Sequence, residues 1–136
     1  MKPSVFLFLG ATGAFLGVAF GAFGAHGLKT MISPEMLAVY KTGVEYQMWH
    51  SFGLIVIALM QQHDMQSRLL KWAGGLMFLG IILFSGSLYT LAILNLPILG
   101  AITPIGGVSF LISWSLLIIF SGKKSSHNKR YKSSRY

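Results

Sequence analysis

AGGLMFLGIILFSGSLYTLAILNLPILGAITPIGGVSFLISWSLLIIFSG, residues 73–122, is the stretch that decides the fold, because it contains no lysine, arginine, aspartate or glutamate. The short sequence NLP at positions 95–97 divides it into two apolar runs. An uncharged apolar helix of about 20 residues crosses the hydrocarbon core of a bilayer. We therefore expect two membrane-spanning helices, at about residues 72–94 and 98–120.

The N-terminal half repeats this pattern more weakly. Residues 5–25 are uncharged and rich in glycine, which predicts a first span. Another apolar run, residues 46–63, contains His50 and lies between Glu45 and Asp64. It is close to the lower length limit for a spanning helix, about 17 residues. The fold class that follows is all-α: an integral membrane four-helix bundle over residues 1–121.

Composition supports a membrane protein of one domain. The chain has 136 residues, 54% of them hydrophobic and 10% charged, whereas a soluble domain carries about 25% charged residues. It has no cysteine, which excludes a disulfide framework. The N-terminus also resembles a secretory signal, but its apolar run is longer than the roughly 7–15 residues typical of a signal peptide. We expect a retained helix.

The distribution of basic residues predicts the orientation. With four spans, one side of the membrane receives both termini and the 61–71 connection, and the other side receives the 27–43 connection. The first side holds nine of the eleven lysine and arginine residues, and the second side holds Lys29 and Lys41. The positive-inside rule then places both termini in the cytoplasm. The external connection contains a helical pattern from Pro34 onward, so a short external interfacial helix is expected between spans one and two.

The C-terminal segment, residues 122–136, is expected to be a basic disordered cytoplasmic tail. It holds six lysine and arginine residues, which would attract anionic lipid at the membrane surface. The net charge of +8 arises mainly from this segment and not from a folded face. We therefore expect no nucleic acid partner.

Small residues recur on the first predicted helix at intervals of four. Such small-xxx-small patterns let two helix backbones approach closely in a membrane. The pattern leaves two alternatives open, packing within the bundle and contact in a homo-oligomer. The residues expected to serve helix packing are Gly13, Gly17, Gly21 and Ala25, with Gly106 and Gly107 on the last span.

Polar residues from all four predicted spans are expected to gather at the external side of the bundle. The topology puts the end of the first span, the start of the second, the end of the third and the start of the fourth at that depth. This predicted polar cluster consists of His26, Glu45, Tyr46, Gln47, His50, Ser85, Ser87, Tyr89 and Thr103.

Two members of the cluster are ionisable, and each has a structural alternative. Glu45 could simply lie among headgroups beside Lys41, with Tyr46 as an interfacial anchor. His50 lies deeper, either as a hydrogen-bonded bridge between helices or as part of a functional polar site. The spacing of Glu45 and His50 does not place both on one helix face, and no His-x-x-x-His pair occurs. We expect no metal site, no cofactor and no catalytic residue.

Four motifs resemble the YgdD/YwdK family of small bacterial inner membrane proteins, which has mitochondrial relatives. They are GAFGAHGL at 21–28, EYQMWH at 45–50, FSGSLY at 84–89 and TPIGGVSF at 103–110. The resemblance covers about residues 4–121. It implies a four-helix protein of the bacterial cytoplasmic membrane, and it supplies no activity, substrate or cofactor.

Three functions remain open at this point. The first is a non-enzymatic assembly or accessory subunit, in a homo-oligomer or a larger membrane complex, whose polar cluster locks the bundle or docks a partner. The second is a proton or small-solute pathway formed by an oligomer. The third is an intramembrane enzyme, for which the sequence shows no nucleophile motif or phosphate loop.

Overall fold

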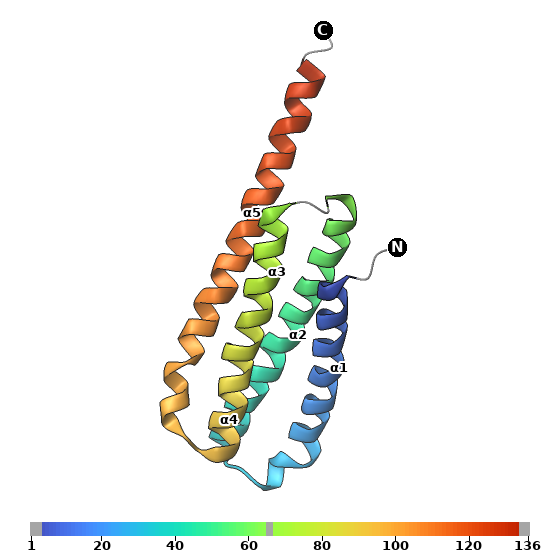
Figure 1. Cartoon of the computed structure of the whole chain (residues 1–136). Coiled ribbons are helices and arrows are strands. Elements are labelled where there is room, and N and C mark those ends of the chain that lie inside the picture. The colour runs from blue at the N-terminus through green and yellow to red at the C-terminus, as the bar shows by residue number, and fades with distance from the viewer. Residues whose placement is uncertain (1–3, 65–66, 134–136) are drawn as a thin grey trace.

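The computed structural model, which describes residues 4–64 and 67–133, is all-helical and consists of four long helical rods (Figure 1). The first rod is α1, Val5–His26, and the second is α2, Pro34–His63. The third comprises α3 (Arg68–Gly80), the π-helical segment η2 (Ile81–Ser85) and α4 (Gly86–Leu94). The fourth is α5, Thr103–Ser133. Two short 3-10 segments, η1 (Leu28–Thr30) and η3 (Pro97–Ala101), lie in the connections.

Local sequence signals mark where the rods begin and end. Ser4, Ser33 and Ser67 each accept a hydrogen bond from a backbone N–H of the following first turn, which is the usual role of serine at a helix start. Pro34 follows Ser33 at the first helical position, where its missing N–H costs nothing. Asn95 ends α4 in the left-handed conformation that asparagine tolerates.

Three helical segments in the described residues are long and apolar enough to cross a membrane: Val5–Thr30, Arg68–Leu94 and Pro97–Lys123. The rod formed by α2 is not among them, although its 30 residues extend for about 45 Å. Three polar residues of α2, Gln47, His50 and Ser51, are buried inside the bundle. A helix covered by its neighbours needs less apolar surface than one that faces lipid. That α2 crosses the membrane as a fourth span stays a prediction.

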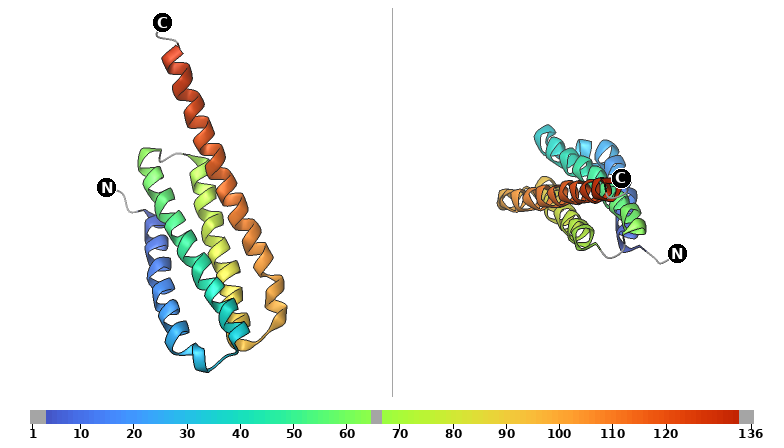
Figure 2. Two further views of the ribbon diagram at one scale, coloured as in Figure 1. Left: turned by 180° about the vertical axis from the view of Figure 1, so that it is seen from behind. Right: turned by 90° about the horizontal axis from the view of Figure 1, so that it is seen from above.

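The rods pack in the order α1, α2, α3–α4, α5, with α1 and α5 at opposite edges (Figure 2). Helix α2 contacts α1 on one side and the α3–η2–α4 rod on the other, and α5 packs on α3 and η2. The start of α1 lies at the end of the bundle beyond which α5 projects (Figure 1). An even number of crossings is consistent with this arrangement. The side of the membrane that each end faces stays a prediction.

Two features differ from expectation. In the described connection between the first two rods there is no separate interfacial α-helix, because the helix that begins at Pro34 continues without a break into the second rod. Helix α5 continues to Ser133 and so covers most of the segment expected to be disordered. Lysine and arginine have high helix propensity, and extending an existing helix avoids the cost of nucleation.

Glycines bring α1 and α2 into close contact. Gly10, Gly17 and Gly24 are buried at intervals of seven residues, the repeat of a helix-packing seam. A Cβ atom at Gly10 would lie 2.7 Å from the backbone oxygen of Ser51. Of the predicted stripe, Gly13 and Gly17 face α2, Gly21 makes ordinary contact with it, and Ala25 is exposed.

A second close approach joins the last two rods. A Cβ atom at Gly106 would meet the backbone of Phe84, whereas one at Gly107 would have only ordinary contact with the Phe84 ring. Apolar side chains fill the rest of the interior in two clusters. One contains Leu54, Ile57, Leu70, Ala73, Met77, Ile81, Phe110 and Phe120, and the other contains Leu28, Tyr40 and Ala92.

Candidate functional site

Buried polar side chains form a layer between the two apolar clusters, at the middle of α2. Gln47 is 4% exposed, and its Nε2 donates a hydrogen bond of 2.8 Å to the backbone carbonyl of Gly13. Gly13 lies near the centre of α1, so Gln47 is at the middle of the bundle and not at its external end. Helix α2 begins at Pro34 and not near residue 46, where the second span was expected to begin. Residue 47 therefore lies about 20 Å along the helix and not in its first turn.

Tyr89 joins the third rod to this position. Its hydroxyl donates a hydrogen bond of 2.7 Å to Oε1 of Gln47. Its ring packs edge-on against Phe20 at 5.3 Å and tilted against Tyr40 at 5.1 Å, measured between ring centroids. The hydroxyl of Tyr40 donates in turn to the backbone carbonyl of Phe20 at 2.7 Å. This chain of contacts connects α1, α2 and α4.

Serine hydroxyls connect the third rod to its other neighbours. Ser85, which ends the π-helical segment, donates a hydrogen bond of 2.7 Å to the carbonyl of Gly43 on α2. Ser87 shares a hydrogen bond of 2.6 Å with Thr103 at the start of α5. Interhelical hydrogen bonds of this kind stabilise helix association in membranes. The bonds of Ser85 and Gln47 both involve α2, whereas Ser87 and Thr103 form a separate pair that joins α4 to α5.

His50 lies on a different face of α2 from Gln47. Its Nδ1 lies 2.6 Å from the carbonyl of Tyr46 on the same helix, and its ring stacks on Phe110 of α5 with centroids 3.5 Å apart. Since a carbonyl only accepts, Nδ1 carries the proton and Nε2 is the acceptor of a neutral ring. Of the two alternatives for His50, a hydrogen-bonded bridge between helices has no support among the described residues, because its contact with the neighbouring helix is aromatic stacking.

Two members of the predicted cluster are not part of this layer. His26 and Glu45 are exposed. His26 ends α1, and Glu45 lies on the outer surface of α2. Tyr46 is 40% exposed and stacks on Phe84 with centroids 4.5 Å apart, on the same side of α2 as His50. The residues predicted as one cluster are therefore divided in the structure. Gln47, Ser85 and Tyr89 belong to the buried layer, Tyr46 and His50 stack on another face of α2, and Ser87 pairs with Thr103.

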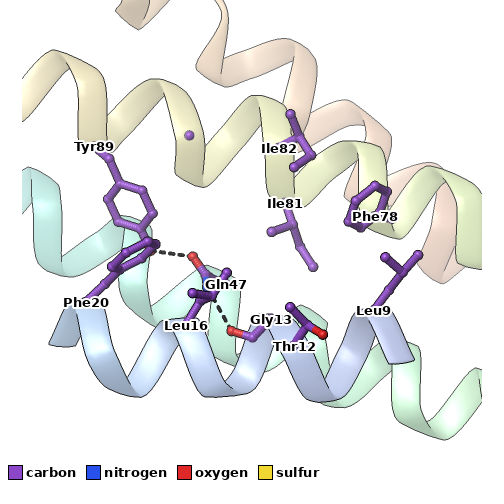
Figure 3. A pocket seen from close by; sticks show the side chains of 11 residues that line it. Leu9, Thr12, Gly13, Leu16, Phe20, Gln47, Phe78, Ile81, Ile82 and Tyr89 are labelled. Atoms are coloured by element: carbon purple, nitrogen blue, oxygen red, sulfur yellow. Dashed lines mark hydrogen bonds between the residues drawn. The ribbon is translucent and has the colours of Figure 1, made fainter. Parts of the chain in front are cut away.

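A cavity of about 380 Å³ lies beside Gln47 and Tyr89 (Figure 3). Its walls are α1 on one side and the α3–η2–α4 rod on the other, with α2 behind them. The lining residues are Leu9, Thr12, Gly13, Leu16, Phe20, Gln47, Phe78, Ile81, Ile82, Gly86 and Tyr89. None of these side chains is charged.

A more open groove of about 490 Å³ lies beside His50, between α2 and α5. Aromatic and aliphatic side chains form most of its surface. Its lining consists of Tyr46, His50, Phe84, Pro104, Gly107, Val108, Phe110, Leu111 and Trp114.

Several buried polar residues were not predicted as part of a site. Ser109 and Ser113 of α5 donate hydrogen bonds of 2.7 and 2.6 Å to the carbonyls of Leu76 and Ala73 on α3. Their spacing of four residues, which places both on one face, could have indicated this role. Ser51 is fully buried, and its Oγ has no hydrogen-bond partner in the described part of the chain.

The described residues offer no assembled metal or acid–base centre. No group of three histidine, aspartate or glutamate side chains comes together among the side chains that the structure describes, residues 4–64 and 67–123. His50, the one buried imidazole among the described side chains, is surrounded by aromatic rings, with Trp114 at 6.0 Å and Phe110 at 3.5 Å between centroids. The arrangement is suited to holding helices together and to presenting a single hydrogen-bond acceptor.

Comparison with known proteins identifies relatives over most of the chain. A family described as "Protein of unknown function (DUF423)" matches residues 20–107. The UPF0382 membrane protein YwdK of Bacillus subtilis is 50% identical over 119 residues, which are 88% of this chain and 97% of YwdK. A UPF0382 membrane protein of Staphylococcus epidermidis is 50% identical over 115 residues, 85% of this chain and 93% of its own. No solved structure matches the chain.

Proposed function

Because the chain belongs to the DUF423 family of UPF0382 membrane proteins, and so is a bacterial membrane protein, we propose that it acts as a non-enzymatic assembly or accessory subunit. The observation that carries this proposal is the use of its buried polar groups. Gln47, Ser85, Tyr89, Ser109 and Ser113 are all engaged in hydrogen bonds between helices. These groups hold the bundle together through bonds between helices.

The groove between α2 and α5 supports a docking role. Val108 and Leu111 are exposed on its α5 side, and Gly107 leaves room beside Phe84. Small residues and exposed aliphatic side chains favour close packing of a second helix in a membrane. The Nε2 atom of His50 has no hydrogen-bond partner in the described part of the chain. We therefore take a transmembrane helix, with a hydrogen-bond donor facing His50, as the partner of this groove.

The pathway alternative gains no support from the geometry. A pathway through the membrane would need polar side chains along α5 beyond its first turn. The candidates are Ser109, Ser113 and Ser115. Ser109 and Ser113 bond to carbonyls of α3, and Ser115 bonds to the Leu111 carbonyl of its own helix. None of the three hydroxyls is turned toward the cavity beside Gln47.

Native mass spectrometry after extraction in a mild detergent tests the proposal. We expect masses above the 14.9 kDa of the single chain, from a second copy or from another membrane protein. Gly107→Leu should fill the groove and reduce the complex. Gly75→Leu is a matched control, because a Cβ atom there has no heavy atom within 4 Å and Gly75 is outside the groove. A strictly monomeric, partner-free wild type would contradict the proposal.

The basic C-terminal segment supports a separate proposal, contact with anionic lipid. The end of α5 projects beyond the other rods (Figure 1), and the sequence after Gly122 holds six basic residues. Attraction to an anionic surface contributes about 1 kcal/mol per lysine or arginine near it. Replacement of these six residues by glutamine should reduce the phosphatidylglycerol that copurifies with the protein. Unchanged retention would contradict this contact.

A further inference from the structure

The cavity beside Gln47 has an opening between α1 and the α3–η2–α4 rod. Leu16 on one wall is 39% exposed, and Ile82 on the other wall is 54% exposed. Both belong to segments long and apolar enough to cross a membrane. The opening therefore faces the hydrocarbon of the bilayer and not water, and the ligand that can reach it is a lipid.

The dimensions favour one flexible chain. A cavity of about 380 Å³ falls in the range of small-ligand sites, roughly 300–1,000 Å³. The lining runs along α1 from Leu9 to Phe20, a length of about 16 Å at the helical rise. A second transmembrane helix, about 10–12 Å wide with its side chains, could enter the cavity only if α1 moved away from the third rod. An aliphatic chain can lie along the lining without moving either wall.

One part of the cavity offers hydrogen bonds. The Nε2 of Gln47 has two hydrogens, one of which is used at Gly13. The hydroxyl oxygen of Tyr89 donates to Gln47 and keeps its acceptor capacity. The hydroxyl of Thr12, also in the lining, has no side-chain hydrogen bond to other described residues. Donors and an acceptor therefore remain for a ligand.

We propose that this cavity binds a neutral lipid, an aliphatic chain that ends in an uncharged ester or hydroxyl group. The chain lies against Leu9, Phe78 and Ile82, and the polar end reaches Gln47 and Tyr89. A charged headgroup is excluded because no lining residue carries a compensating charge, and an unpaired charge is costly in an apolar site. This binding does not depend on the proposed role in assembly.

Photo-crosslinking of the full chain in phosphatidylethanolamine–phosphatidylglycerol nanodiscs tests the proposal. The probe is a monoacylglycerol with a diazirine in its acyl chain. We expect saturable labelling of the lining residues of α1 and η2 that unlabelled monoacylglycerol competes away. A free fatty acid and a phosphatidylglycerol with the same diazirine chain should label without saturation. Saturable labelling by either charged probe would overturn the requirement for a neutral head.

Two substitutions separate the cavity from the general lipid surface. Gly86 has helical dihedral angles, and a Cβ atom there has no heavy atom within 4 Å, so Gly86→Leu should fold and obstruct the cavity that Gly86 lines. We expect it to abolish saturable labelling, while Gly75→Leu, which adds the same side chain outside the cavity, preserves it. Thr12→Val, which replaces the hydroxyl of an exposed residue by a methyl group, should weaken the saturable labelling.

Three results would overturn the proposal. The first is labelling spread evenly over lipid-facing residues such as Ile105 and Ile118. The second is saturable labelling that survives both Gly86→Leu and Thr12→Val. The third is crosslinking of two copies through α1 at this opening, which would show that a second chain covers it.

Discussion

The hydroxyl of Tyr89 and the side-chain amide of Gln47 share a hydrogen bond of 2.7 Å across two different rods of the bundle. The same amide donates to Gly13 of a third helix. One glutamine at the middle of α2 thus connects α1, α2 and α4. Removing one partner of a buried hydrogen bond leaves the other unsatisfied, which costs about 1–3 kcal/mol. The stability of the bundle should therefore depend on such pairs.

Close contact between α1 and α2 should be sensitive to a single added methyl group. In Gly10→Ala the new Cβ atom would lie 2.7 Å from the backbone oxygen of Ser51, so the two helices must separate. We expect a loss of about 1–3 kcal/mol, as for other overpacked interiors, measured by thermal unfolding in detergent. Gly75→Ala, where the added atom meets open space, should be neutral or slightly stabilising. Equal melting temperatures would contradict the close packing.

Serine hydroxyls between α5 and α3 should contribute measurably to stability. Ser113 is fully buried and bonds to the Ala73 carbonyl, whereas the exposed Ser115 bonds to its own helix. Interhelical hydrogen bonds in membrane proteins contribute about 0.6 kcal/mol on average. Ser113→Ala should therefore lower the melting temperature more than Ser115→Ala. The reverse order would show that the Ser113 bond does not hold the two rods together.

His50 should stabilise the protein through stacking and its hydrogen bond. In His50→Ala the face of Phe110, now 3.5 Å from the imidazole, loses its partner, and the Tyr46 carbonyl loses a donor. Aromatic pairs contribute about 0.5–1.5 kcal/mol beyond area burial. His63→Ala is the control, because His63 is exposed at the end of α2. Comparable melting temperatures would contradict a structural role of His50 and favour a functional one.

The orientation can be read with single cysteines, since the natural chain has none. Met31 and Gln62 are both exposed. Met31 lies just before the start of α2 and Gln62 lies in its last turn, so the two are at opposite ends of that helix. With both termini in the cytoplasm, Met31→Cys should react with a membrane-impermeant maleimide in intact cells. Gln62→Cys should react only after permeabilisation. The opposite pattern would reverse the predicted orientation.

The sequence predicts the long helices well because charge and hydropathy are averaged over many residues. The helical pattern from Pro34 onward marks a helix start that the structure confirms. It predicts the position of individual side chains less well. The depth of Gln47 depends on where α2 begins, and a break between an interfacial helix and the second span was expected where none exists. The start of α2 at Pro34 places Gln47 near the middle of that helix and not in its first turn.

The faces of α2 also escaped prediction. Gln47 and His50 are three residues apart, which makes them neighbours on a helix, yet one contacts α1 and the other α5. Which face each residue presents depends on how the rods are arranged around α2, and a single sequence does not contain that arrangement. The acceptors of the interhelical hydrogen bonds also could not be predicted. They are the backbone carbonyls of Gly13, Gly43 and Ala73, whose side chains give no sign of this role.

A double-mutant cycle on Gln47 and Tyr89 tests most directly the claim that buried polar groups hold the helices together. The variants are Gln47→Leu, Tyr89→Phe and the pair, with unfolding free energies measured in one detergent. We predict that the double variant loses less stability than the two single variants summed, with a coupling of about 0.5–2 kcal/mol. Strictly additive losses, or single variants as stable as the natural protein, would contradict the account.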